Sequence, residues 1–173
     1  MATPRDIRRL AFQTLFQLDA RGGGDAEAVL LSLVNAPEFT DPERQRAFDL
    51  ASDAFDARAA ADAEFLALAP AWPTHRQPAA DRAILRLAHF EITAARVAPK
   101  IAINEAVELA KEFGTDRSPA FVNGLLDKVL KRVAARPAAP AADAPALDIS
   151  NLDAPASDAV SPPTPAEAPH GAA

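Results

Sequence analysis

The chain has 173 residues, of which 49% are hydrophobic and 24% are charged, and its formal net charge is −6. It contains no cysteine, which excludes a disulfide framework and any thiolate metal site, and its apolar runs fall short of the roughly 18 residues that a membrane span needs. Polar residues interrupt the apolar side chains behind the N-terminal arginines, so we expect no signal peptide and a cytoplasmic protein.

The charge is distributed unevenly along the chain. Residues 1–133 carry 17 basic and 19 acidic side chains, so this part is close to neutral. Within it, residues 1–24 have a net charge of +2, residues 25–70 of −7 and residues 71–133 of +3. An acidic chain can therefore still build a nucleic-acid surface from the two ends of its folded part, although indiscriminate binding is not expected.

Every element predicted in the first half is a helix. Thr3 and Thr40 are each followed by a proline and an acid, a pattern typical of a capped helix start. The expected helices cover residues 3–21, 25–34 and 40–69, the last of them long, alanine-rich and open to a kink. The glycines at 22–24 are interpreted as a linker, because no Lys-Ser/Thr follows them as in a phosphate-binding loop.

The second half begins with a loop rich in proline at residues 70–78. Its Trp72 is expected to plug the core between helices. Helices are then predicted for residues 81–96, 100–113 and 118–133. Gly114 stands where a left-handed C-cap belongs, and Ser118 followed by proline starts the final helix.

The first helix presents two aromatic side chains away from its apolar stripe. Turning the helix by about 100° per residue places Phe12 and Phe16 among Arg5, Arg8 and Arg9. One interpretation is a helix buried on two sides, with its arginines reaching out to solvent. The other is a contact surface for a protein partner or for stacked, negatively charged nucleotides.

Two later helices also carry polar groups beside apolar ones. The fourth predicted helix is apolar almost all round, and its narrow strip of Arg82, Arg86 and His89 is expected to be a solvated edge. In the last helix, Phe121 lies at the rim of the core stripe near Lys128 and Arg132. It is the second place where an aromatic ring adjoins cations.

No catalytic or metal-binding pattern is present in the sequence. His75, His89 and His170 have no partners at ligand spacing. Pairs such as Glu105 and Glu108 are more simply a solvated helix face than an acid and base pair. We therefore expect no enzyme, no metal and no cofactor.

Residues 134–173 differ in composition from the rest. They hold eight of the 16 prolines, many alanines and five acids, with few bulky apolar side chains. Such a segment buries too little surface to offset its ordering entropy. The sequence thus predicts a helical RNA-binding domain at residues 1–133 and a disordered, acidic, Ala/Pro-rich tail at residues 134–173.

Three segments resemble the signature of the NusB family of transcription antitermination factors. They are Asp81–Ala88 (DRAILRLA), Pro99–Gly114 (PKIAINEAVELAKEFG) and Phe121–Lys128 (FVNGLLDK). The first helix resembles the family's arginine-rich first helix more loosely, and residues 25–78 agree only in helical pattern.

The resemblance implies an all-α fold of two packed three-helix subdomains. It also implies binding of the boxA element of nascent, single-stranded RNA, together with the small-subunit ribosomal protein that acts as NusE. Such a pair helps RNA polymerase to read through terminators, chiefly in ribosomal RNA operons, and supports ribosomal RNA maturation.

The resemblance and the wheel of the first helix together select two sets of site residues. The residues expected to contact RNA are Arg5, Arg8, Arg9, Lys111, Asp116, Arg117, Ser118, Phe121 and Asn123. The residues expected to contact the protein partner are Phe12, Phe16, Asp81, Arg82 and Arg86.

Two other functions remain open at this point. NusB-like domains also precede the catalytic domain of ribosomal RNA cytosine methyltransferases, although nothing after Arg136 could form a cofactor-binding sheet. A helical adaptor without RNA contact is the second alternative. The face of the first helix could also pair with itself, which leaves a homodimer open.

Overall fold

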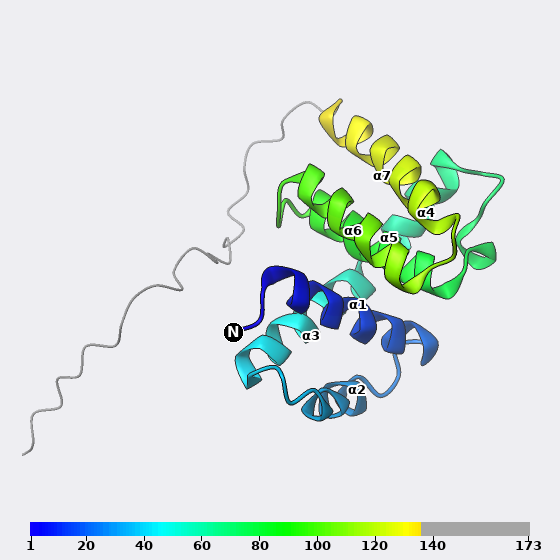
Figure 1. The fold of residues 1–173 in the computed structure, drawn as a ribbon. Helices are drawn as coiled ribbons and strands as arrows, with labels where there is room; N and C mark the ends of the chain where they lie inside the picture. The colour runs from blue at the N-terminus through cyan, green and yellow to red at the C-terminus, as the bar shows by residue number, and fades with distance from the viewer. Residues whose placement is uncertain (136–173) are drawn as a thin grey trace, which may run out of the picture. The chain divides into compact units, whose positions relative to one another are not determined.

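The computed structural model describes residues 1–135, and this part of the chain consists of helices and turns without a strand (Figure 1). The α-helices are α1 (Pro4–Ala20), α2 (Ala26–Ser32), α3 (Asp41–Asp56), α4 (Arg58–Leu68), α5 (Ala79–Thr93), α6 (Pro99–Phe113) and α7 (Ser118–Ala134). Two short 3-10 turns are η1 (Leu33–Asn35) and η2 (Thr74–Arg76). The predicted all-α fold is confirmed. The tail expected from residue 134 onward lies, apart from its first two residues, outside the described part.

The helices pack in two groups that share one core. Helices α1, α2 and α3 form the N-terminal group, and α4 to α7 form the C-terminal group (Figure 1). Helix α5 contacts both groups, since it packs against α1 and α3 as well as against α4, α6 and α7. Its almost wholly apolar surface is explained by this central position.

The long helix predicted for residues 40–69 divides at Ala57, so its two halves join different groups. At the break, the Arg58 guanidinium donates to the Phe55 carbonyl (2.8 Å) and lies over the Phe55 ring, 3.8 Å from its centroid. The Phe55 ring is buried and occupies the space beside Gly23. Phe55 thus packs against the end of α1 at the point where the chain changes direction. The alanine-rich sequence predicts only a kink there.

Trp72 is not the core plug that the sequence predicts, because its side chain is 55% exposed. Its backbone N–H donates to the Ala69 carbonyl (2.9 Å), and its carbonyl accepts from the side-chain amide of buried Gln77 (3.1 Å). The turn is therefore held by its own hydrogen bonds. The indole is left outside the core, beside Phe121.

Gly114 ends α6 in an extended conformation, with φ −96° and ψ −163°, so the predicted left-handed C-cap is wrong. The glycine is needed for a different reason. A Cβ at this position would lie 2.5 Å from the Ser118 Cβ and 2.6 Å from the Ala110 carbonyl oxygen. Close approach of α7 to the end of α6 therefore requires the missing side chain.

Candidate nucleic-acid interface

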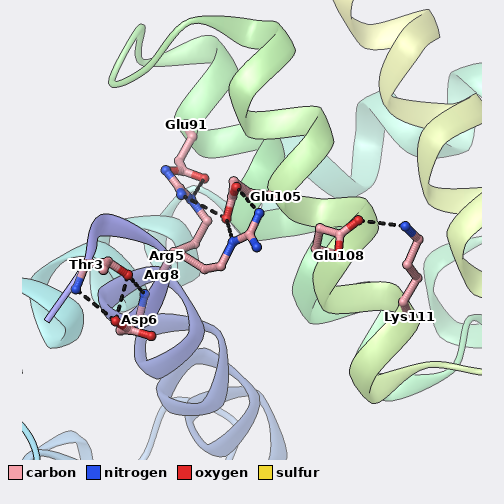
Figure 2. Close-up of polar contacts among 8 residues, drawn as sticks. All are labelled: Thr3, Arg5, Asp6, Arg8, Glu91, Glu105, Glu108 and Lys111. Carbon is pink, nitrogen blue, oxygen red and sulfur yellow. Dashed lines mark hydrogen bonds and ion pairs between the residues drawn. The ribbon is translucent and has the colours of Figure 1, made fainter.

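The start of α1 is fixed by a capping box. The Thr3 hydroxyl accepts from the Asp6 N–H (3.2 Å), and the Asp6 carboxylate accepts from the Thr3 N–H (2.8 Å), as Figure 2 shows. The Thr3 hydroxyl also donates to the Asp6 carboxylate (2.6 Å), and this bond, together with the one from the Thr3 N–H, lowers the pKa of Asp6. The Glu43 carboxylate of α3 also accepts from the Ala2 N–H (2.9 Å). The first turn, and with it the register of the N-terminal arginines, is thereby set from two sides.

Two of the three N-terminal arginines are exposed along the side of α1 that faces α6. The Arg5 guanidinium, 61% exposed, donates through Nε and Nη2 to Glu105 (3.0 and 2.8 Å). The hydrogen bonds and charge of this pair raise the pKa of Arg5 and lower that of Glu105. Arg9 pairs with Glu112 and lies 5.6 Å from the centroid of the Phe113 ring. Both arginines are thus solvent-accessible cations with carboxylate partners.

Arg8 does not lie on this surface, and the predicted phosphate contact is therefore corrected. It is 7% exposed, and its Nε and Nη2 donate to the buried Glu91 carboxylate of α5 (2.9 and 2.8 Å; Figure 2). The Glu105 carboxylate lies 3.7 Å from its Nη1. Arg8 joins α1 to α5 inside the protein, because its position lies on the side of the helix that carries the buried Ala11 and Leu15.

The junction between α6 and α7 presents polar side chains from a short, tightly held turn. The Ser118 Oγ accepts from the Thr115 N–H (2.8 Å), and the Ser118 N–H donates to the Thr115 carbonyl (2.9 Å). Ser118 is only 1% exposed, so the prediction that it contacts RNA is corrected to a role in holding the turn. The reason is the close packing at Gly114 described above.

Other residues predicted at this junction are on the surface. The exposed ones are Lys111, Asp116, Arg117 and Asn123, and Phe121 is half-buried. Lys111 pairs with Glu108 (2.6 Å), which lowers the pKa of that glutamate. The Phe121 ring packs on the Trp72 ring, with centroids 6.5 Å apart and an angle of 59° between the planes. The junction thus combines cations, an amide, a carboxylate and an aromatic pair.

The two phenylalanines of α1 have different positions. Phe12 is 3% exposed, and its ring centroid lies 4.8 Å from that of Phe113. Its predicted role at the partner surface is corrected, because it is part of the packing between α1 and α6. Phe16 is 39% exposed and lies 6.4 Å from the Phe12 ring. The functional interpretation of this face is therefore restricted to Phe16.

The polar strip of α5 is not the solvated edge that the sequence predicts. Arg86 is 6% exposed and is held by Asp19 of α1 and Asp62 of α4, each at 2.6 Å. Half-buried Arg82 also pairs with Asp19 (2.6 Å). Burial raises the pKa of Asp19, but the Arg82 and Arg86 hydrogen bonds lower it by more. His89 is buried as well, 3.0 Å from the Glu64 carboxylate.

These contacts correct two predicted partner residues of α5. Burial alone would lower the pKa of Arg86, yet the Asp62 and Asp19 carboxylates raise it, so its charge is satisfied internally. Asp81 is 3% exposed and lies in the first turn of α5. Arg86 therefore supports the surface from inside, Asp81 is buried away from it, and Arg82 reaches it only in part. The sequence does not reveal this, because Asp19 and Asp62 are distant along the chain.

Other kinds of site find no support in the described residues. Residues 1–135 contain no group of three or more histidine, aspartate or glutamate side chains placed to hold a metal ion. No helix within this range is long and apolar enough to cross a bilayer. Two features remain for ligand binding. One is a pocket between α1 and α6 that is lined by the N-terminal arginines and by Glu105, Glu108 and Glu112, and the other is the aromatic junction of Phe121 and Trp72.

Comparison with known proteins places the chain in a family. The fold defines it first as an all-α protein of two packed helical groups. The sequence model of the NusB family matches residues 5–131, and the chain belongs to this family. It is 40% identical over 130 residues to the transcription antitermination protein NusB of Herpetosiphon aurantiacus, covering 73% of this chain and 88% of that protein. It is 36% identical to the protein of the same name from Kineococcus radiotolerans, covering 75% and 93%.

Solved structures agree with this assignment. The chain resembles T. maritima NusB with a TM-score of 0.67 and 31% identity, over 76% of this chain and 93% of that one. It also shares its fold with NusB in a complex of the antitermination factors NusB and NusE with double-stranded RNA, with a TM-score of 0.65 and 22% identity, over 74% and 96%. The match extends over most of the length of these antitermination proteins, which does not favour the methyltransferase alternative.

Proposed function

We propose that this protein is a transcription antitermination factor that binds boxA-type RNA together with the ribosomal protein NusE, in the antitermination complex of RNA polymerase in the cytoplasm. Membership of the NusB family supports this function. The observation that carries it in the structure is the junction of α6 and α7. There Arg117, Asn123 and the Phe121 ring are presented from a rigid turn.

The RNA-facing surface in this proposal runs along α1 and α6 to the junction. Arg5 pairs with Glu105 in the middle of α6, and Arg9 pairs with Glu112 near its end. The two arginines therefore lead toward Arg117 at the start of α7. Phosphates would bind along this line of cations, whereas the ring and amides at the junction suit unstacked bases.

The carboxylates beside the arginines shape the expected binding. A phosphate that binds Arg5 or Arg9 competes with Glu105 or Glu112 for the same guanidinium. The electrostatic gain is smaller than it would be for an unpaired arginine, and it depends on salt. This arrangement favours a weak interaction of the protein alone and a stronger one when a basic partner adds further phosphate contacts.

The partner surface is proposed around Phe16, the exposed aromatic residue of α1. Half-buried Arg82 lies on the neighbouring α5 and is oriented by Asp19 of α1. Phe16 lies one turn before Asp19, the residue that pairs with Arg82, and exposed aromatic residues and arginines are enriched in binding hot spots. The internal ion pairs of Arg86 keep α1, α4 and α5 in place behind this surface.

The proposal is tested by binding of a labelled boxA RNA to this protein, to NusE and to the two together, at two salt concentrations. We expect the pair to bind more tightly than either protein alone, with an affinity that falls as salt rises. A scrambled RNA and boxA annealed to its complement are the controls. Equal binding of boxA and scrambled RNA contradicts sequence recognition, and absence of binding supports the adaptor alternative.

Matched variants locate the site. Arg117→Gln at the junction should weaken binding of boxA RNA by the pair. Lys131→Gln removes another exposed charge, from the last turn of α7, and should leave binding unchanged. If both variants weaken binding equally, the effect is one of net charge, and the junction is not the site.

A further inference from the structure

An exposed tryptophan stands next to the proposed RNA site and is not used by it so far. Trp72 precedes η2, in the loop between α4 and α5, and its side chain is 55% exposed. Its ring contacts the Phe121 ring of α7, with centroids 6.5 Å apart. A large aromatic side chain left in solvent gives up the free energy of burial, so its position calls for a functional explanation.

The loop holds the backbone that carries the indole in one conformation. The Trp72 N–H and carbonyl are both hydrogen-bonded, to Ala69 and to Gln77. The following residues form a 3-10 turn in which the Arg76 N–H donates to the Pro73 carbonyl (2.8 Å). Prolines at 70, 73 and 78 restrict the backbone further. Little ordering entropy is lost when a ligand binds to such a preorganised ring.

Two exposed basic residues belong to the same helix and the same loop as the two rings. Lys128 lies two turns after Phe121 on α7, and its ammonium donates to the Leu68 carbonyl at the end of α4 (3.3 Å). Arg76 is exposed in the same loop as Trp72. Within residues 1–135, neither Lys128 nor Arg76 forms an ion pair with a carboxylate, unlike Arg5 and Arg9. Their positive charge is therefore not compensated by a nearby partner.

We propose that Trp72 and Phe121 form a two-ring platform on which bases of single-stranded RNA stack, with Lys128 and Arg76 as phosphate contacts. This inference rests on the proposed function, and it extends the RNA site from the junction to the loop between α4 and α5. Aromatic rings amid uncompensated cations are the combination that binds single strands with little dependence on sequence. An apolar protein partner would gain from the rings but not from the cations.

The angle between the rings specifies how bases bind. The planes are tilted by 59°, so one continuous base stack cannot lie flat on both. Each ring takes a separate base, and the RNA backbone bends between them. A duplex cannot present its bases in this way, and duplex RNA is therefore excluded from the platform.

The composition of the chain provides a direct readout. Trp72 is the only tryptophan and the chain has no tyrosine, so its fluorescence excited near 295 nm reports on this one side chain. Titration of the full-length protein with single-stranded boxA RNA should quench the emission, as stacking of a base on an indole does. When NusE is present, the titration is repeated with Trp72→Phe. This variant has no tryptophan, so its emission gives the NusE background to be subtracted.

Three variants test how much Trp72 contributes to the affinity for boxA RNA, measured with labelled RNA. Trp72→Ala should weaken binding by the pair about 5- to 150-fold, the equivalent of one lost base stack, and Trp72→Phe should retain most of the affinity. Leu31→Ala truncates an apolar side chain on α2 that is 62% exposed and should have no effect. Because Trp72 is outside the core, its removal should leave the thermal unfolding temperature almost unchanged.

The outcomes separate the platform from the function on which it rests. If the pair binds boxA RNA specifically, but Trp72→Ala binds equally well and the emission does not change, the platform is refuted and the proposed function stands. If Trp72→Ala loses affinity for NusE in the absence of RNA, the rings bind protein and the platform is refuted. If the pair binds no RNA, both proposals fail.

Discussion

The guanidinium of Arg8 and the carboxylate of Glu91 form a buried ion pair between α1 and α5, with an Nη2 to Oε1 distance of 2.8 Å. Their side chains are only 9% and 3% exposed. The pair removes one arginine from the expected phosphate-binding row and makes it part of the joint between the two helical groups. Breaking a pair of this kind leaves a charge in the interior, which costs far more than loss of a surface pair.

Glu91→Gln should therefore lower the free energy of unfolding by about 3 kcal/mol, because Arg8 then keeps its charge in a buried site with only Glu105 nearby. Glu112→Gln, which breaks the exposed pair with Arg9, should cost less than about 1 kcal/mol. Denaturant unfolding of both variants measures the difference. The double variant Arg8→Met, Glu91→Leu should be more stable than Glu91→Gln alone, and a double variant that is less stable would contradict the buried-charge explanation.

Two glycines should respond to alanine in opposite directions. Gly114→Ala places a Cβ 2.5 Å from the Ser118 Cβ and should destabilise the protein by about 1–3 kcal/mol. Gly124→Ala, inside α7, meets nothing within 4 Å and should stabilise it by about 0.5–1 kcal/mol, because alanine favours the helix. Thermal unfolding of the two variants checks the prediction. A stabilised Gly114→Ala would show that α6 and α7 do not approach so closely.

Arg5 and Arg9 are the N-terminal arginines that remain available to phosphates. Replacing both with glutamine should reduce the slope of log K against log salt for boxA binding by about 1.4, if each makes one phosphate contact with a single strand. Replacing Lys131 and Arg132, in the last turn of α7, removes the same charge and serves as the control. An unchanged slope in the Arg5 and Arg9 variant would exclude these arginines from the RNA surface.

Glu43 should make the stability depend on pH in the acid range. The hydrogen bonds from the Thr40 and Ala2 N–H groups hold the pKa of Glu43 at about 2, against an ordinary value of 4.5. Because the folded state lowers this pKa, the contribution of Glu43 is complete above pH 4.5 and is lost as the pH falls from 4.5 toward 2.

Unfolding of the wild type and of Glu43→Gln, measured from pH 6 to pH 2.5, tests this dependence. Below pH 4.5, the difference in the free energy of unfolding between the wild type and Glu43→Gln should shrink progressively. Glu38→Gln alters an exposed glutamate of the preceding loop and controls for the change in net charge. Parallel curves for the wild type and Glu43→Gln would show that the hydrogen bonds at Glu43 do not perturb its titration.

The helix starts could be predicted because their signals are local. Both predicted capping boxes are confirmed, at Thr3 with Asp6 and at Thr40 with Glu43. The family and the all-α fold also follow from short-range patterns. Among the site residues, the exposure predicted for Arg5 and Arg9 agrees with the structure, whereas their contacts with RNA remain predictions.

The errors at Arg8, Arg86 and Phe12 have a common physical cause, which is contact between residues far apart in the chain. A helical wheel places Arg8 and Arg86 on polar strips, but it cannot show that Glu91 and Asp19 lie opposite them. The wheel also cannot show that Phe113 covers Phe12. Each buried cation is paired across the interior with a carboxylate from another helix, and such pairs need the tertiary fold to be seen.

The ion pairs of Arg86 also constrain how the molecule can move. The Arg86 guanidinium forms ion pairs with Asp19 of the N-terminal group and with Asp62 of the C-terminal group. Moving the two helical groups apart would leave the buried Arg86 charge without its Asp19 partner. Hinge motion between the groups should therefore be suppressed, and both groups should unfold in one transition. The Arg86 pairs should consequently keep α1, with its exposed arginines, at a constant spacing from α4 and α5 when RNA binds.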